Sequence, residues 1–131
     1  MKYPPEKIEM LLREAKSASE NTYSPYSGSA AGAAVLATDG HIFSGTNIEN
    51  ASYGLTVCAE RVAIGNAISA GSDQIEAIAI HGPDDSISPC GACRQFILEF
   101  GRNIIVIFRK HGKIMEMSIE ELLPFAFSMK V

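Results

Sequence analysis

Three absences in the sequence limit what the protein can be: it has few cysteines, no cluster of positive charge and no long apolar run. The 131 residues include only three cysteines, an odd number that cannot all pair in disulfides within the chain. Eleven Lys and Arg residues against 15 Asp and Glu residues give a net charge of −4. A nucleic-acid-binding protein usually carries a basic patch. We therefore expect a small-molecule partner and no nucleic acid.

No segment has the composition of a membrane span or of a secretion signal. The uncharged stretch over residues 21–38 contains several Ser, Thr and Pro residues, whereas a spanning helix needs ~20 predominantly apolar residues. Residues 1–16 carry charges where a signal peptide needs a continuous apolar stretch. These features predict a cytoplasmic protein without membrane contact, in which thiols stay reduced.

The chain also lacks internal repeats, low-complexity tracts and long linkers. Its composition, 47% hydrophobic and 20% charged, supplies enough apolar side chains for a hydrophobic core. We expect residues 1–131 to form one domain.

Hydrophobic periodicity and turn residues divide this chain into nine predicted elements. In order, they are a helix through 8–18, strands over 30–38 and 41–46 around Asp39-Gly40, a helix over 57–70, a strand over 75–80, a helix over 90–101, strands over 104–108 and 114–117, and a short helix before Pro124. Strands that alternate with helices indicate a sheet covered on both faces. The predicted fold class is α/β, a three-layer α/β/α sandwich with a five-stranded mixed sheet.

All three cysteines lie where the chain enters a predicted helix. Cys58 is followed by Ala59, Glu60 and Arg61, and the second segment is Pro89-Cys90-Gly91-Ala92-Cys93-Arg94. The partial positive charge of a helix N-terminus favours thiolate over thiol. In such folds the two helix starts can lie side by side at one end of the sheet.

The cysteine pattern admits three interpretations. Cys90 and Cys93 could form a redox-active pair, but Cys58 and Glu60 would then have no role. A structural zinc site would need a fourth ligand from His41, His81, His111 or a carboxylate. Three protein ligands and one open position instead characterise catalytic zinc, which the sequence favours. Glu60 can then face the open position and move protons without binding the metal.

Two arginines adjoin this pattern and can offset its excess negative charge. Three thiolates on one Zn²⁺ leave a net charge of about −1. Arg61 and Arg94 are each next to a residue of the predicted site, and we expect both to donate hydrogen bonds to thiolates.

Several segments, together and in the same order, resemble the cytidine deaminase family, in its small homotetrameric form with three zinc cysteines. They are YSPYS (23–27), AGAAV (31–35), NIENASYG (47–54), CAER (58–61), SPCGACRQ (88–95) and ELLPFAF (121–127). The two segments that contain cysteine, CAER and SPCGACRQ, match a three-cysteine version of the zinc deaminase signature. The resemblance extends over nearly the whole chain.

This resemblance implies a role for each matching residue. Cys58, Cys90 and Cys93 match the ligands of one Zn²⁺ per chain, and Glu60 matches the catalytic proton shuttle. The implied substrate contacts are Asn47 and Glu49 to the ribose, the Ala59 amide to the pyrimidine carbonyl, Phe127 stacking on the base from a neighbouring subunit, and Tyr53 in the intersubunit part of the site. Many relatives have phenylalanine in the base pocket where this chain has Ser29, which predicts weaker base stacking.

The implied reaction is hydrolytic deamination of cytidine and 2′-deoxycytidine to uridine or deoxyuridine and ammonia, in pyrimidine salvage. The implied assembly is a homotetramer whose subunits share active sites. Three alternatives use the same residues: deamination of a related nucleoside analogue or nucleoside antibiotic, deamination of a polynucleotide, and a non-catalytic domain stabilised by zinc. The net negative charge argues against a polynucleotide substrate.

Overall fold

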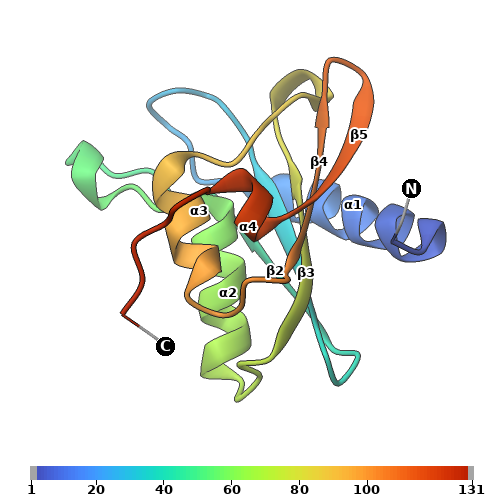
Figure 1. Cartoon of the computed structure of the whole chain (residues 1–131). Coiled ribbons are helices and arrows are strands. Elements are labelled where there is room, and N and C mark those ends of the chain that lie inside the picture. Colours follow the sequence, from blue (N-terminus) through green and yellow to red (C-terminus); the bar gives the residue numbers. More distant parts are fainter. Residues whose placement is uncertain (1–2, 130–131) are drawn as a thin grey trace.

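A computed structural model describes residues 3–129, which form a central sheet with helices on both of its faces (Figure 1). Along the chain the elements are α1 (Pro5–Ser19), β1 (Gly32–Ala37), β2 (Ile42–Thr46), the 3-10 helix η1 (Tyr53–Leu55), α2 (Ala59–Ser69), β3 (Ile75–His81), the 3-10 helix η2 (Pro83–Asp85), α3 (Gly91–Leu98), β4 (Ile105–Lys110), β5 (Lys113–Ser118) and α4 (Ile119–Leu122). The predicted order of helices and strands is confirmed. The two 3-10 helices are additions that the sequence pattern does not indicate.

The five strands lie in the order β2-β1-β3-β4-β5, and the predicted five-stranded mixed sheet is confirmed. Only β3 and β4 are parallel to each other, with Ile78 opposite Val106. The connection between these two strands contains α3, as parallel neighbours require a crossover. The other neighbouring pairs are antiparallel, and the predicted Asp39-Gly40 turn joins β1 to β2, with Gly40 at a φ of +93°.

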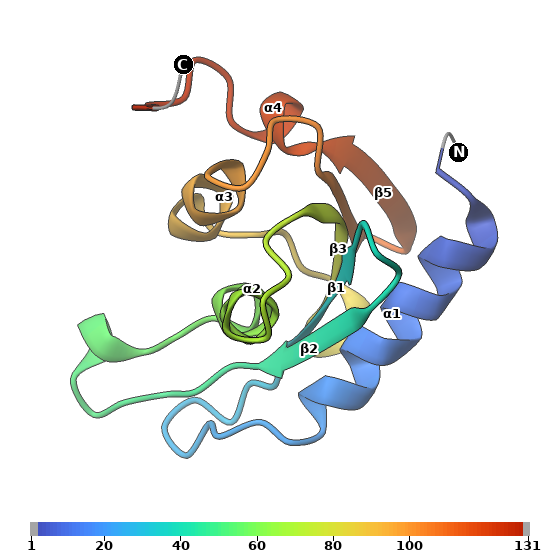
Figure 2. The ribbon, with the colours of Figure 1, turned by 90° about the horizontal axis from the view of Figure 1, so that it is seen from below.

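Alternate residues of the central strands divide the interior between the two faces. Ala34 and Leu36 of β1 pack with the apolar side of α1, whereas Ala33 and Val35 pack under α2 and α3. Figure 2 shows α1 on one face of the sheet and α2 and α3 on the other. The predicted three-layer α/β/α sandwich is therefore confirmed. None of the helices among residues 3–129 has the length and apolar character to cross a membrane.

Two glycines allow helices to approach the sheet closely. A Cβ atom on Gly32 of β1 would collide with the carbonyl oxygen of Ala15 in α1. A Cβ atom on Gly45 of β2 would lie 2.5 Å from the backbone nitrogen of Ala63 in α2. Both contacts are with helix backbone, which cannot rotate away as a side chain can. The distance of α2 from the sheet, and with it the position of Cys58, therefore depends on Gly45.

We expect Gly45→Ala to lower the free energy of unfolding by about 1–3 kcal/mol, the usual cost of forcing an extra methyl group into a packed interior. Gly65 is the matched control because it lies within α2 and a Cβ there would meet no atom within 4 Å. Gly65→Ala should raise stability by about 0.5–1 kcal/mol through helix propensity. Thermal unfolding at one protein concentration measures both effects. Equal stability of the two variants would contradict the close approach at Gly45.

Candidate metal centre and active site

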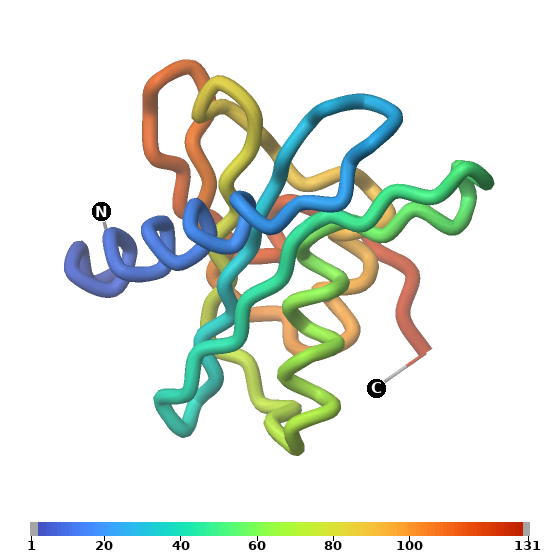
Figure 3. Tube along the Cα trace, turned by 180° about the vertical axis from the view of Figure 1, so that it is seen from behind, coloured from blue at the N-terminus to red at the C-terminus, as the bar shows by residue number. Residues whose placement is uncertain are grey.

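The N-termini of α2 and α3 place three cysteine side chains together. Cys58 is the N-cap residue of α2 and Cys90 is the N-cap residue of α3, both in extended backbone conformation. Cys93 lies in the first turn of α3. Neither N-cap side chain makes a capping hydrogen bond, so both sulfurs remain available to another partner. Figure 3 shows α2 (light green) next to α3 (orange), both to one side of the strand β2.

The Sγ atoms of Cys58, Cys90 and Cys93 all lie within 4.8 Å of one another. Within residues 3–129, no His, Asp or Glu ligand atom joins this group. Three clustered thiols at helix N-termini form a soft donor set that suits Zn²⁺. The donor set therefore fits a zinc ion with three protein ligands, and the histidine needed for a four-ligand structural site is not supplied by His41, His81 or His111.

The cysteines differ in the ease with which they lose a proton. The pKa of Cys58 is lowered to about 5, because hydrogen bonds from Cys93 and Arg61 stabilise its thiolate. The pKa of Cys93 is raised, because its thiol donates to Cys58 and because it is buried near the Glu60 carboxylate. A second or third thiolate at this site therefore needs a compensating positive charge, which a divalent cation supplies.

Arg61 provides part of that positive charge from within the chain. Its Nη2 atom donates to the Thr56 carbonyl oxygen at 3.3 Å and to Cys58 Sγ at 3.8 Å. The hydrogen bond to Cys58, and then the negative charge of its thiolate, raise the pKa of Arg61. The Arg61 Nε atom is buried and has no hydrogen-bond partner among the described residues. The guanidinium group is thus oriented by one carbonyl oxygen and one sulfur.

Arg94 differs from the expectation that it donates to a thiolate. Its Nε atom donates to the Pro89 carbonyl oxygen at 2.8 Å and its Nη1 atom to the Leu122 carbonyl oxygen at 2.9 Å. Long side chains on a helix point toward its N-terminus, and this direction brings Arg94 to the two carbonyl oxygens. Carbonyl oxygens are better hydrogen-bond acceptors than sulfur. Arg94 therefore ties the residue before Cys90 to the end of α4.

Glu60 is a buried carboxyl group in the first turn of α2, with 4% of its surface exposed. Burial raises the pKa of Glu60, and the nearby Cys58 thiolate raises it further. Among the described residues it is the only buried side chain of an acidic or basic type. A carboxyl group held away from solvent beside three sulfurs can exchange protons with a molecule bound there.

Asn47 and Glu49 hold the loop between α1 and β1 at the same end of the sheet. The Asn47 Oδ1 atom accepts hydrogen bonds from Thr22 Oγ1 at 2.6 Å and from the Ala31 amide at 3.0 Å. The Glu49 carboxylate accepts from the amides of Tyr26 and Ser27 and from the Ser27 hydroxyl. These hydrogen bonds, that from the Ser27 hydroxyl most of all, lower the pKa of Glu49.

A cavity of about 300 Å³ lies beside this loop, lined by Tyr26, Ser27, Glu49, Tyr53 and Thr56. Thr56 links the cavity to the metal centre, because its carbonyl oxygen accepts from Arg61. Sequence reasoning assigned no role to Tyr26, Ser27 or Thr56. The YSPYS segment contains the only available signal for the first two.

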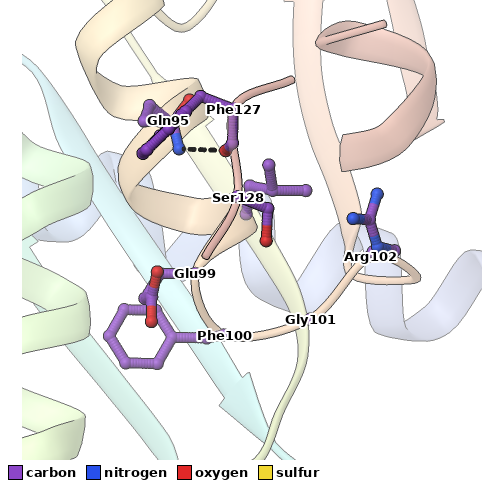
Figure 4. Close-up of a pocket in the computed structure, with 8 residues that line it drawn as sticks. Gln95, Glu99, Phe100, Gly101, Arg102, Phe127 and Ser128 are labelled. Atoms are coloured by element: carbon purple, nitrogen blue, oxygen red, sulfur yellow. Dashed lines mark hydrogen bonds between the residues drawn. The ribbon is translucent and has the colours of Figure 1, made fainter. Parts of the chain in front are cut away.

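Tyr53 and Phe127 are both exposed in the single chain, by 79% and 73%. Tyr53 lies in η1, which projects from the body of the molecule (Figure 1). Phe127 lies beside α3, where its carbonyl oxygen accepts from Gln95 Nε2 at 2.9 Å (Figure 4). A separate cavity of about 220 Å³ borders Phe127, and no cysteine lines it. The aromatic ring of Phe127 is therefore largely open to solvent in the single chain.

The family model described as "Cytidine and deoxycytidylate deaminase zinc-binding region" matches residues 5–109. A cytidine deaminase of Sporosarcina psychrophila is 45% identical over 124 residues, which cover 92% of this chain and 91% of the relative. A blasticidin-S deaminase of Bacillus cereus is 38% identical over 106 residues, covering 74% of this chain and 76% of the relative.

Solved structures agree with these sequence relationships. The crystal structure of cytidine deaminase from Burkholderia pseudomallei matches with a TM-score of 0.85 and 44% identity, covering 91% of this chain and 98% of that one. The enzyme from Mycobacterium tuberculosis matches with a TM-score of 0.83 and 37% identity, covering 92% and 97%. Because the match includes both cysteine segments and most of the fold, this chain belongs to the cytidine and deoxycytidylate deaminase family with its zinc-binding region.

Proposed function

We propose that this chain is a zinc-dependent cytidine deaminase, acting as one domain on cytidine and 2′-deoxycytidine in pyrimidine salvage. Water adds its oxygen to C4 of the base, the bond from C4 to the exocyclic amine breaks, and uridine or deoxyuridine and ammonia are released. The observation that carries this proposal is the combination of three sulfurs within 4.8 Å of one another and a buried carboxyl group beside them.

Cys58, Cys90 and Cys93 would hold the zinc ion. Bound there, zinc would supply a water molecule whose pKa is lowered from that of bulk water. Glu60 takes a proton from the attacking water and delivers it to N3 of the base. Its carboxyl group then carries a second proton to the exocyclic nitrogen, so that the amine leaves as ammonia. Burial of Glu60 keeps bulk water from competing for these protons.

Three of the proposed substrate contacts, those of Ala59, Glu49 and Asn47, are supported by the geometry of the single chain. Ala59 is the first residue of α2, where backbone amides lack helical acceptors and can donate to the carbonyl oxygen of the pyrimidine. Glu49 is held ionised by its three hydrogen bonds, which suits it to accept from a ribose hydroxyl. Asn47 lies two residues away and is fixed by the same loop.

We further propose that the protein is a cytoplasmic homotetramer in which a neighbouring subunit completes each active site. Large apolar side chains are left exposed in η1 and in the C-terminal segment, including Tyr53, Leu55, Phe125 and Phe127. Solvent-exposed aromatic residues of this kind favour burial against another subunit. In such an assembly Phe127 stacks on the base bound by its neighbour and Tyr53 borders the shared site. The three free thiols suit a reducing compartment.

The first test is loss of cytidine absorbance with purified, zinc-loaded protein and with Glu60→Gln. We expect the wild type to convert cytidine and the variant to lose roughly 10²–10⁴-fold in kcat, the usual contribution of a general acid–base residue. Glu6→Gln is the matched control because it makes the same change at an exposed position of α1. Zinc content is measured for all three proteins. Wild-type protein that holds one zinc per chain and leaves cytidine unchanged would refute the proposed function.

Removing the contact between Arg61 and Cys58 should weaken metal retention. We expect Arg61→Gln to lower zinc affinity by about 10–100-fold, as is common for residues that orient metal ligands. Competition with a chromophoric chelator measures this effect without reference to activity. Arg102→Gln is the control, since Arg102 is exposed and its Nη1 atom lies 3.6 Å from Glu120. If both variants bind zinc as the wild type does, Arg61 has no part in holding the metal.

Deamination of a nucleoside antibiotic is a second candidate, favoured by the similarity to a blasticidin-S deaminase. The two candidates are separated by comparing kcat/KM for cytidine, free cytosine and blasticidin S. We expect cytidine to be the best of the three, and free cytosine to be poor because it offers no ribose to Glu49. A higher kcat/KM for blasticidin S than for cytidine would reverse the assignment of the substrate.

A further inference from the structure

A third cavity, of about 270 Å³, lies between α1 and the end of β4. Glu9, Leu12, Arg13 and Lys16 line it from α1, and Arg109 lines it from β4. The four helix residues have the spacing of one side of a helix. Leu12 is buried, so its side chain belongs to the floor of the cavity, and the charged side chains surround it.

This cavity is on the opposite face of the sheet from the metal centre. Arg109 follows Ile107 by two positions on β4, and Ile107 packs with the apolar residues of α1. Residues two apart on a strand point to the same face. The cysteines, in contrast, belong to α2 and α3, which cover the other face. A ligand in this cavity therefore cannot be part of the proposed deaminase site.

Positive charge is concentrated at this cavity, although the chain as a whole has a net charge of −4. Three of the 11 Lys and Arg residues line it. In the part of the chain that the structure describes, the side chains of Arg13 and Lys16 make no ion pair or hydrogen bond. Arg109 has a partner, since its Nη1 atom lies 3.4 Å from Asp85 Oδ1.

His81 shows that these charges act on the same region. Its Nδ1 atom lies 3.3 Å from Asp85 Oδ1, so Asp85 is shared between His81 and Arg109. The pKa of His81 is lowered, by burial first and then by the charges of Lys16 and Arg109, despite the opposing effect of Asp85. The positive charges of Lys16 in α1 and Arg109 in β4 thus both act on His81, at the end of β3.

We propose that this cavity binds a phosphate group, either as free phosphate or as the end of a small phosphorylated molecule. A phosphate presents oxygens in several directions, so it can contact Arg13, Lys16 and Arg109 at once. A carboxylate has only two oxygens in one plane and satisfies fewer of them. The guanidinium groups can bind phosphate oxygens in a bidentate manner, and the Lys16 ammonium adds a point charge.

Glu9 makes the proposal testable in both directions, because it is the one acidic residue that lines the cavity. Its carboxylate repels a bound anion, so neutralising it should strengthen binding, whereas neutralising Arg13 should weaken it. Glu6→Gln and Arg102→Gln are the matched controls. They change the net charge by the same amounts, and neither Glu6 nor Arg102 lines the cavity.

The experiment is a calorimetric titration of zinc-loaded protein with inorganic phosphate at fixed ionic strength. We expect one phosphate per chain, a Kd roughly tenfold or more higher in Arg13→Gln, and a severalfold lower Kd in Glu9→Gln. Both controls should bind as the wild type does. Arg, Glu and Gln have similar helix propensities, so α1 should be retained, which circular dichroism checks. Absence of saturable binding, or equal effects in the variants and their controls, would overturn the proposal.

A parallel titration with a nucleoside triphosphate, UTP, and with uridine identifies the source of the phosphate. Tighter binding of UTP than of inorganic phosphate, again weakened by Arg13→Gln, assigns the cavity to a phosphorylated nucleotide. Weaker binding of UTP assigns it to the free anion. Binding of uridine that Arg13→Gln leaves unchanged reports the deaminase site and serves as an internal reference.

Discussion

The meeting of two helix N-termini at one end of the sheet is the constraint on which the rest of the site depends. Cys58 is the N-cap residue of α2 and Cys90 that of α3, so the position of each sulfur follows from where its helix starts. Clustered sulfurs repel one another once ionised, and the helix termini, Arg61 and a divalent cation all act against that repulsion. The site is therefore built from backbone geometry first and from side-chain charge second.

The fold fixes these helix starts through contacts some distance from the sulfurs. Gly45 sets how closely α2 lies on the sheet, and the parallel pair β3 and β4 obliges α3 to cross over the same face. Arg94 then fastens the residue before Cys90 to α4. Small side chains of the central strands, such as Ala34 and Ala79, let α1 close the other face. Each layer contributes to a site that only a few residues touch.

The sequence was sufficient to predict the order of elements, the mixed sheet and the grouping of the cysteines. These features follow from local periodicity and from residue types with few alternative roles, as with Cys58 and Glu60. The sequence was not sufficient to predict which hydrogen-bond partner a side chain takes when several candidates lie far away along the chain. Arg94 donates to two carbonyl oxygens, and Glu49 accepts from the hydroxyl group of Ser27. The cavity between α1 and Arg109 was also hidden, because nothing in the sequence relates residues about 95 positions apart on two elements.

The burial of Glu60 has a consequence for how this sequence can change during evolution. An acidic side chain enclosed by protein costs folding free energy that a neutral one of the same shape would not. Selection for stability therefore acts against the glutamate, while selection for proton transfer retains it. The fully buried Ala59, Ala63 and Ile64 on the same helix must offset that cost. Substitutions in the apolar side of α2 should accordingly be less tolerated than equally buried substitutions in α1, because α1 carries no buried acidic side chain among the described residues.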